Sequence, residues 1–141
     1  MKKTIDYRLS IGEKQTLKSK KVTLKMLQDY APDEIAELLS ASPERSRELS
    51  ALAEFQSIPS LGINFAEELI SQGYYSLDQL KGKNAVELFS AFERYCGTRP
   101  DPCVEDCYRL LVHYIENRDD TKRWWHFTDE RKAYREERGI R

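Results

Sequence analysis

The chain has 141 residues, of which 40% are hydrophobic and 33% are charged, a composition typical of one compact globular domain with tails. No apolar run approaches the roughly 20 residues needed to cross a bilayer, and the N-terminal MKKTIDYRLS has charges where an export signal needs an apolar core. We therefore expect a cytoplasmic protein that does not contact membranes. Its three cysteines are expected to be reduced thiols.

The net charge of −1 conceals an uneven distribution. Residues 1–25 carry eight Lys or Arg and two acidic residues, a net charge of +6, so the remaining 116 residues sum to −7. Residues 1–22 are predicted to form a basic arm, extended or mobile, with a weakly indicated strand at 5–9. An acidic globular part binds polyanions poorly, so Lys18, Lys20 and Lys21 of the arm are the expected source of attraction for nucleic acid.

Helical periodicity begins at Thr23 and continues to Pro32, where a second helix is expected to start. A third helix is predicted from Pro43, with Ser42 as its N-cap. Its buried stripe consists of Leu49, Leu52, Ala53 and Phe55.

The segment Ile58–Ile63, IPSLGI, lies directly between two helical segments. Pro59 prevents the preceding helix from continuing, and Gly62 is expected to supply the positive φ that a tight turn between helices requires. The next helix is predicted over 64–72, with Asn64 as its N-cap and Gly73 at its end. This arrangement indicates a helix-hairpin-helix motif.

A short connecting helix is expected at 76–80, followed by helices at 84–95 and 103–115. Between the latter two lies a second hairpin, residues 96–102, which is longer and contains two prolines. This order predicts an all-α, multi-helix domain over 23–127, built on a pair of helix-hairpin-helix units of which the second is degenerate.

The C-terminal part begins with the aromatic cluster Arg123–Phe127. Since exposure of this cluster would be costly, we expect it to pack back on the core as a lid, although a partner chain could also cover it. Residues 128–141 are predicted to form a charged helix, capped by Thr128, Asp129 and Glu130.

Three segments together resemble one known group of proteins. They are FQSIPSLGINFAEELISQGYYSLDQLKG, DPCVEDC and WWHFTDERKAYRE. Over residues 50–138 the chain resembles the small bacterial helix-hairpin-helix proteins of the pathogenicity-locus family, which are also labelled mitomycin-resistance-like. The resemblance implies an all-helical fold and a link to DNA, and it implies no particular biochemical activity.

The first hairpin is the leading candidate for binding a phosphate. Helix N-termini offer backbone N–H donors and a positive partial charge, so Leu61, Gly62, Ile63 and Asn64 are predicted to contact DNA phosphates. DNA-binding hairpins of this kind carry a second glycine and often a basic residue, whereas here Asn64 and Phe65 stand at those positions, followed by two glutamates. A purely structural hairpin is therefore the alternative.

The second hairpin offers Thr98 and Arg99, a hydroxyl and a guanidinium that could clamp a phosphate. In the alternative interpretation Asp101 holds Arg99 in a salt bridge or caps the following helix. Residues 32–50 also resemble a helix-turn-helix, in which Arg45 and Arg47 would have to read a groove beside Glu44 and Glu48.

The cysteines raise two further hypotheses. Cys96, Cys103, Cys107 and His113 are the candidate ligands for a zinc ion, but the chain lacks a CxxC knuckle, so we predict no metal and no cofactor. Cys103, at the start of its helix, is the only candidate nucleophile. The chain has no recognisable catalytic motif, and we expect no enzymatic activity.

The sequence thus favours a non-enzymatic protein that binds the DNA backbone weakly and without sequence specificity, through the two hairpins and the arm. The alternative function is a protein-interaction or scaffold module that does not bind DNA. In that case Trp124 and Trp125 would be partly exposed and would contact a protein partner or a second copy of the chain.

Overall fold

The computed structural model describes residues 4–139. This part of the chain is all-α, with eight α-helices and two short 3-10 helices, and it contains no strand. None of its helices is long and apolar enough to cross a membrane. The chain divides into two units, residues 4–57 with 62–76 and residues 58–61 with 77–139.

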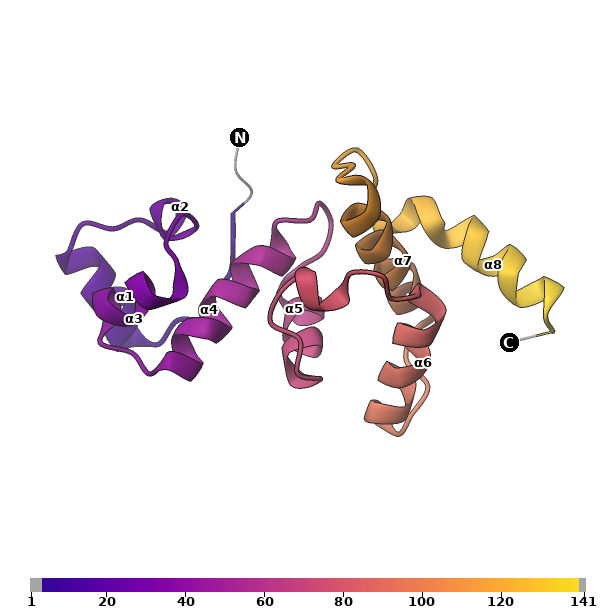
Figure 1. The fold of residues 1–141 in the computed structure, drawn as a ribbon, viewed down its shortest axis with the longest axis horizontal. Coiled ribbons are helices and arrows are strands. Elements are labelled where there is room, and N and C mark those ends of the chain that lie inside the picture. The colour runs from indigo at the N-terminus through magenta and orange to yellow at the C-terminus, as the bar shows by residue number, and fades with distance from the viewer. Residues whose placement is uncertain (1–3, 140–141) are drawn as a thin grey trace. The chain divides into compact units, whose positions relative to one another are not determined.

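The first unit contains five helices: α1 (Ile11–Ser19), α2 (Leu24–Leu27), α3 (Pro32–Leu39), α4 (Pro43–Gln56) and α5 (Ile63–Ser71). Helix α3 packs against α4, and both α1 and α5 join this group (Figure 1). The predicted N-cap of α4 is confirmed, because the Ser42 hydroxyl accepts the N–H of Arg45 at 3.1 Å. The core includes Leu49, Leu52 and Phe55, all predicted from the periodicity of α4.

The N-terminal segment differs from the expected extended arm. Residues 5–9 form no strand, yet Ile5 and Tyr7 are only 1% and 2% exposed, and residues 11–19 form α1, whose Leu17 is also buried. Ser10 and Glu13 start this helix with a capping box, which was not among the predicted features. The side-chain amide of Gln56 on α4 both donates to and accepts from the backbone of Asp6.

The second unit contains 3-10 helix η1 (Asp78–Leu80), α6 (Ala85–Cys96), α7 (Pro102–Asn117), 3-10 helix η2 (Trp124–Phe127) and α8 (Thr128–Glu137). Helices α6 and α7 lie side by side, and η2 packs against α7 (Figure 1). Tyr108 of α7 is 1% exposed and contacts the rings of Phe89 and Phe92 at centroid distances of 6.4 and 6.0 Å. These aromatic contacts form the centre of the α6–α7 packing.

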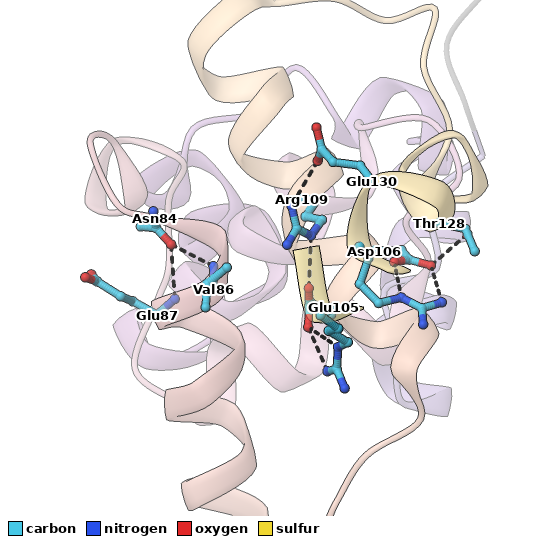
Figure 2. A network of polar contacts seen from close by, with 10 residues as sticks. Asn84, Val86, Glu87, Glu105, Asp106, Arg109, Thr128 and Glu130 are labelled. Carbon is cyan, nitrogen blue, oxygen red and sulfur yellow. Dashed lines mark hydrogen bonds and ion pairs between the residues drawn. The ribbon is translucent and has the colours of Figure 1, made fainter. Parts of the chain in front are cut away.

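Helix α8 is held to α7 by buried ion pairs (Figure 2). Asp106, 0% exposed, accepts from Arg131 at 2.9 Å and from the hydroxyl of Thr128 at 2.8 Å. Glu105 accepts from Arg135 of α8 and from Arg109 of α7. The sequence predicted that Thr128 caps this helix. Instead, Thr128 is the first residue of α8, and its hydroxyl donates to Asp106.

Candidate nucleic-acid interface

The first hairpin has a different backbone from the predicted one. Gly62 lies in the extended region (φ −105°, ψ −170°), while Ser60 takes the left-handed conformation with a φ of 68°. Helix α5 begins at Ile63, so Gly62 and not Asn64 is its N-cap. The expectations for Gly62 and Asn64 were therefore wrong, because the left-handed residue lies two positions earlier than the glycine that suggested it.

The start of α5 keeps the features needed for an anion. Because Gly62 has no side chain, the first turn has no side-chain cap. Gly62 and Asn64 are exposed and Ile63 is half-buried, whereas Leu61 is 1% exposed. Leu61 is thus a core residue, and its backbone N–H already donates to the carbonyl oxygen of Ile58 at 3.2 Å.

Arg8 brings a cation to this helix terminus from a distant part of the sequence. Its Nη2 atom donates to Oδ1 of Asn64 at 3.2 Å and lies 3.5 Å from a carboxylate oxygen of Glu67. It therefore offsets one of the acidic residues that weakened the phosphate interpretation. A depression of about 730 Å³ is lined by Arg8, Lys14 and Gly62 among other residues.

Arg8 was not among the predicted site residues. It is 56 positions from Asn64, and no local spacing connects the two. The only sequence pattern that points to Arg8 is the alternation of the apolar residues Ile5 and Tyr7. This alternation predicts that both side chains are buried, as observed, and that the next residue, Arg8, lies on the opposite face of the segment.

The three predicted lysines of the N-terminal segment are all exposed. Lys18 lies in the last turn of α1, and Lys20 is its C-cap residue. The Nζ atom of Lys20 donates to the carbonyl oxygen of Leu38 at 2.6 Å. Lys20 is thus partly committed to a structural contact with α3.

The second hairpin places several basic side chains around one depression. Helix α6 ends at Gly97, which has a φ of 70°, and α7 begins at Pro102. Thr98 and Arg99 are exposed, and together with Arg94 they line a depression of about 740 Å³. Arg135 and Glu93 also line it.

Asp101 makes neither of the contacts that the alternative interpretation required. It is the N-cap residue of α7 without a side-chain hydrogen bond, and within residues 4–139 the guanidinium groups of Arg94 and Arg99 have no hydrogen-bond or ion-pair partner. Arg94 was not among the predicted site residues. Its position in the last turn of α6, five residues before Arg99, was the signal that could have found it.

The two arginines of the helix-turn-helix interpretation are already engaged in contacts. Arg45 binds both carboxylate oxygens of Glu13, pairs with Glu48 and donates to the carbonyl of Arg8. Arg47 lies over the ring of Tyr75, 4.0 Å from its centroid. Both side chains stabilise the first unit, and neither is placed in the manner of a groove-reading residue.

The zinc candidates are not assembled into a site. Among residues 4–139 no group of three or more His, Cys, Asp or Glu side chains is placed to hold a metal ion. Cys96 is exposed, Cys103 and Cys107 are half-buried, and none of the three forms a disulfide bond. His113 instead contacts Asp119 at 3.0 Å.

The aromatic segment packs against α7, as expected, but it does not form a buried lid. None of the residues of η2 is buried, and Trp125 is 52% exposed. Trp124 is half-buried, and its backbone N–H donates to the hydroxyl of Ser60 at 3.0 Å. Trp125 stands edge-on to Trp124, with ring centroids 5.5 Å apart and an interplanar angle of 84°.

The chain is similar in sequence to one family of known proteins. The family described as Cdd1, Pathogenicity locus, matches residues 48–133, more than half of the chain. The chain is also 29% identical over 80 residues to the mitomycin resistance protein McrB of Streptomyces lavendulae, with 57% of this chain and 75% of that protein covered. No solved structure matches the chain significantly. The resemblance noted in the sequence is confirmed, and the chain belongs to the Pathogenicity locus family.

Proposed function

We propose that this protein is a non-enzymatic protein that binds the DNA backbone without sequence specificity. In this proposal the binding is carried by two helix-hairpin-helix motifs, α4–α5 and α6–α7. The observation that carries the proposal is the second hairpin, where Arg94, Thr98 and Arg99 surround one depression and both guanidinium groups are exposed without partners among the described residues. Unpaired arginine side chains beside a hydroxyl are well suited to phosphate oxygens.

The first hairpin supports the same function by different means. The uncapped start of α5 favours negative charge, and Arg8 supplies a cation where this type of hairpin often has a basic residue in sequence. The exposed Lys18 and Lys21 add attraction of longer range. The acidic balance of residues 26–141 opposes binding, so we expect weak affinity with a steep dependence on salt.

Fluorescence anisotropy with labelled duplex and single-stranded DNA at low salt tests the proposal. Arg94→Gln combined with Arg99→Gln should weaken binding, and the slope of log K against log salt should become less steep by about 2, because each lost phosphate contact changes it by about 0.9. Lys122→Gln combined with Lys132→Gln removes the same charge outside the depression and is the matched control. Equal effects of the two pairs would mean that net charge alone matters, and absence of binding to either DNA would exclude the proposal.

The exposed Trp125 favours a second candidate, a protein-interaction module. An aromatic side chain of this size that is 52% exposed is a common anchor of protein interfaces. Light scattering tests this candidate for self-association: a concentration-dependent increase in mass that Trp125→Ala abolishes would support it. A monomer at all concentrations, with DNA binding unaffected by Trp125→Ala, would favour the DNA function.

A further inference from the structure

The second unit contains a pocket of about 450 Å³ that belongs to neither hairpin. It lies between the first turn of α6, the middle of α7 and the η2–α8 segment, and its lining residues include Val112, Phe127 and Tyr134 beside several polar residues. A volume of this size accommodates a small organic molecule. The question is which chemistry the polar part of the pocket would recognise.

Arg109 is the polar residue of the pocket whose bonding is incomplete. Its Nε donates to Glu105 and its Nη1 to Glu130, both at 3.0 Å. Its Nη2 is buried and has no hydrogen-bond partner within the described part of the chain. Since the side chain is nine-tenths buried, the unpartnered donor carries a desolvation cost, which an acceptor placed beside it would remove.

The Nη2 atom of Arg109, which lacks an acceptor among the described residues, lies on the side of the guanidinium that faces α6. Figure 2 shows the third nitrogen of the Arg109 guanidinium directed toward the first turn of that helix, where Asn84 and Val86 also line the pocket. Asn84 caps α6 by accepting from the N–H groups of Val86 and Glu87 at 2.8 and 3.3 Å. The positive end of a twelve-residue helix and an unsatisfied guanidinium donor therefore share one pocket.

With Arg109 included, the formal charges of the Lys, Arg and Glu side chains that line the pocket sum to zero. Lys83 adds a second cation, and Glu116 and Glu130 add two carboxylates. Glu130 is already paired with Arg109, and Glu116 is exposed, so solvent screens its charge. The strongest unmet demand is therefore for a hydrogen-bond acceptor with negative charge.

We propose that this pocket binds a small organic anion. An oxygen of its carboxylate or phosphate group accepts a hydrogen bond from Nη2 of Arg109, and its apolar body packs against Val112, Phe127 and Tyr134. The site is independent of the DNA-binding function, because it uses none of the residues assigned to the two hairpins. Aromatic walls favour a flat apolar body, so aromatic acids and aromatic phosphate esters are suitable probes.

The first experiment uses the unmodified protein. Arginine side-chain resonances are followed by NMR during titration with phenyl phosphate, benzoate, inorganic phosphate and benzyl alcohol. We expect saturable shifts of the Arg109 signals with phenyl phosphate or benzoate, at least tenfold tighter than with the other two probes. Saturation by only one aromatic anion identifies the acidic group. Saturation by neither, or equal saturation by benzyl alcohol, overturns the proposal.

Two substitutions complete the test. Arg109→Lys keeps the charge but removes Nη2, and we expect it to weaken binding of the preferred anion at least tenfold. Arg118→Lys makes the same chemical change on a residue outside the pocket and should leave affinity unchanged. If Arg109→Lys does not fold, Val112→Trp fills the pocket from an uncharged position and should abolish binding. Unchanged affinity in the folded Arg109→Lys or Val112→Trp protein contradicts the assignment.

Discussion

At the scale of single residues, the ion pair between Glu13 and Arg45 stabilises the N-terminal part of the first unit. Arg45 donates from Nε and Nη2 to the two carboxylate oxygens at 2.9 and 2.8 Å. These hydrogen bonds are the main reason that the pKa of Glu13 is lowered from 4.5 to about 2, against the opposing effect of burial. The pKa of Arg45 is raised by the same contact.

The stabilisation by Glu13 should disappear in acid. A carboxyl group whose pKa is lowered by folding contributes stability that is complete above its unfolded pKa, near 4.5, and is lost as pH falls through its folded pKa, about 2. At pH 7 we expect Glu13→Gln to lower the free energy of unfolding by about 1 kcal/mol. Urea unfolding from pH 7 to pH 2 should show this difference shrinking. Glu37→Gln, on the exposed face of α3, is the control, with an expected change within about 0.5 kcal/mol.

The extended backbone of Gly62 gives a second prediction at this scale. A Cβ atom added there meets nothing within 4 Å, and serine is a good N-cap, so Gly62→Ser should leave thermal stability unchanged or raise it slightly. The new hydroxyl would accept an N–H of the first turn of α5 and compete with a phosphate for it, so DNA affinity in the anisotropy assay should fall. Gly97→Ser is the contrast, because at a φ of 70° it should cost about 1 kcal/mol. A similar loss of stability in Gly62→Ser would contradict the observed turn.

At the scale of secondary-structure elements, the attachment of α8 depends on two acidic residues of α7. Glu105 and Asp106 are 3% and 0% exposed, and each binds an arginine of α8. Arg131 and Arg135 are each 9% exposed, which is unusual for arginine unless it is paired. A helix made almost entirely of charged and polar residues is therefore held to α7 by buried ion pairs.

Removal of one partner should be costly because it leaves the other charge buried. We expect Asp106→Ala to lower the free energy of unfolding by about 3–5 kcal/mol, since Arg131 loses its acceptor. Asp101→Ala, at the N-cap of the same helix, is the matched control, because Asp101 makes no side-chain cap bond, and its effect should stay within about 0.5 kcal/mol. Urea unfolding measures both variants. Similar values for the two would mean that the ion pair is not a source of stability.

At the scale of the whole molecule, residues 4–19 are part of the first unit. Ile5, Tyr7 and Leu17 are buried, and burial together with the nearby charge of Asp29 raises the pKa of Tyr7 to about 12. Arg8 and the carboxylate of Glu13 connect the same segment to α5 and α4. Residues 4–19 thus provide both charged contacts and buried apolar side chains to the first unit, so deletion of this segment would remove both.

Deletion of residues 1–21 should therefore destabilise the first unit. Each of the three buried side chains is worth roughly 1.5–3 kcal/mol, so several kcal/mol should be lost. Hydrogen exchange should show lower protection of α4 and α5. The double substitution of Lys18 and Lys21 by Gln removes exposed charge, leaves the contact of Lys20 with Leu38 intact, and should retain protection. Unchanged protection after the deletion would indicate that the segment is an independent arm.

Several features of the fold followed from the sequence alone. Periodicity and local capping predicted the helices from Pro32 onward to within a few residues, and the N-cap of α4 at Ser42 was correct. Such features depend on neighbours within one helical turn. Helix α1 was missed because its apolar stripe consists of little more than Leu17. The motifs of residues 50–138 also sufficed to identify the family.

The features that the sequence did not reveal depend on residues far apart in the chain. The cation beside α5 comes from Arg8, and the acceptors for Arg131 and Arg135 come from α7, 25 and 30 positions away. Likewise, which arginines are engaged and which are open to a ligand cannot be read from their spacing. Local patterns determine where helices begin and end, whereas the pairing of charges requires the three-dimensional packing, because a charge is neutralised by whatever the fold places beside it.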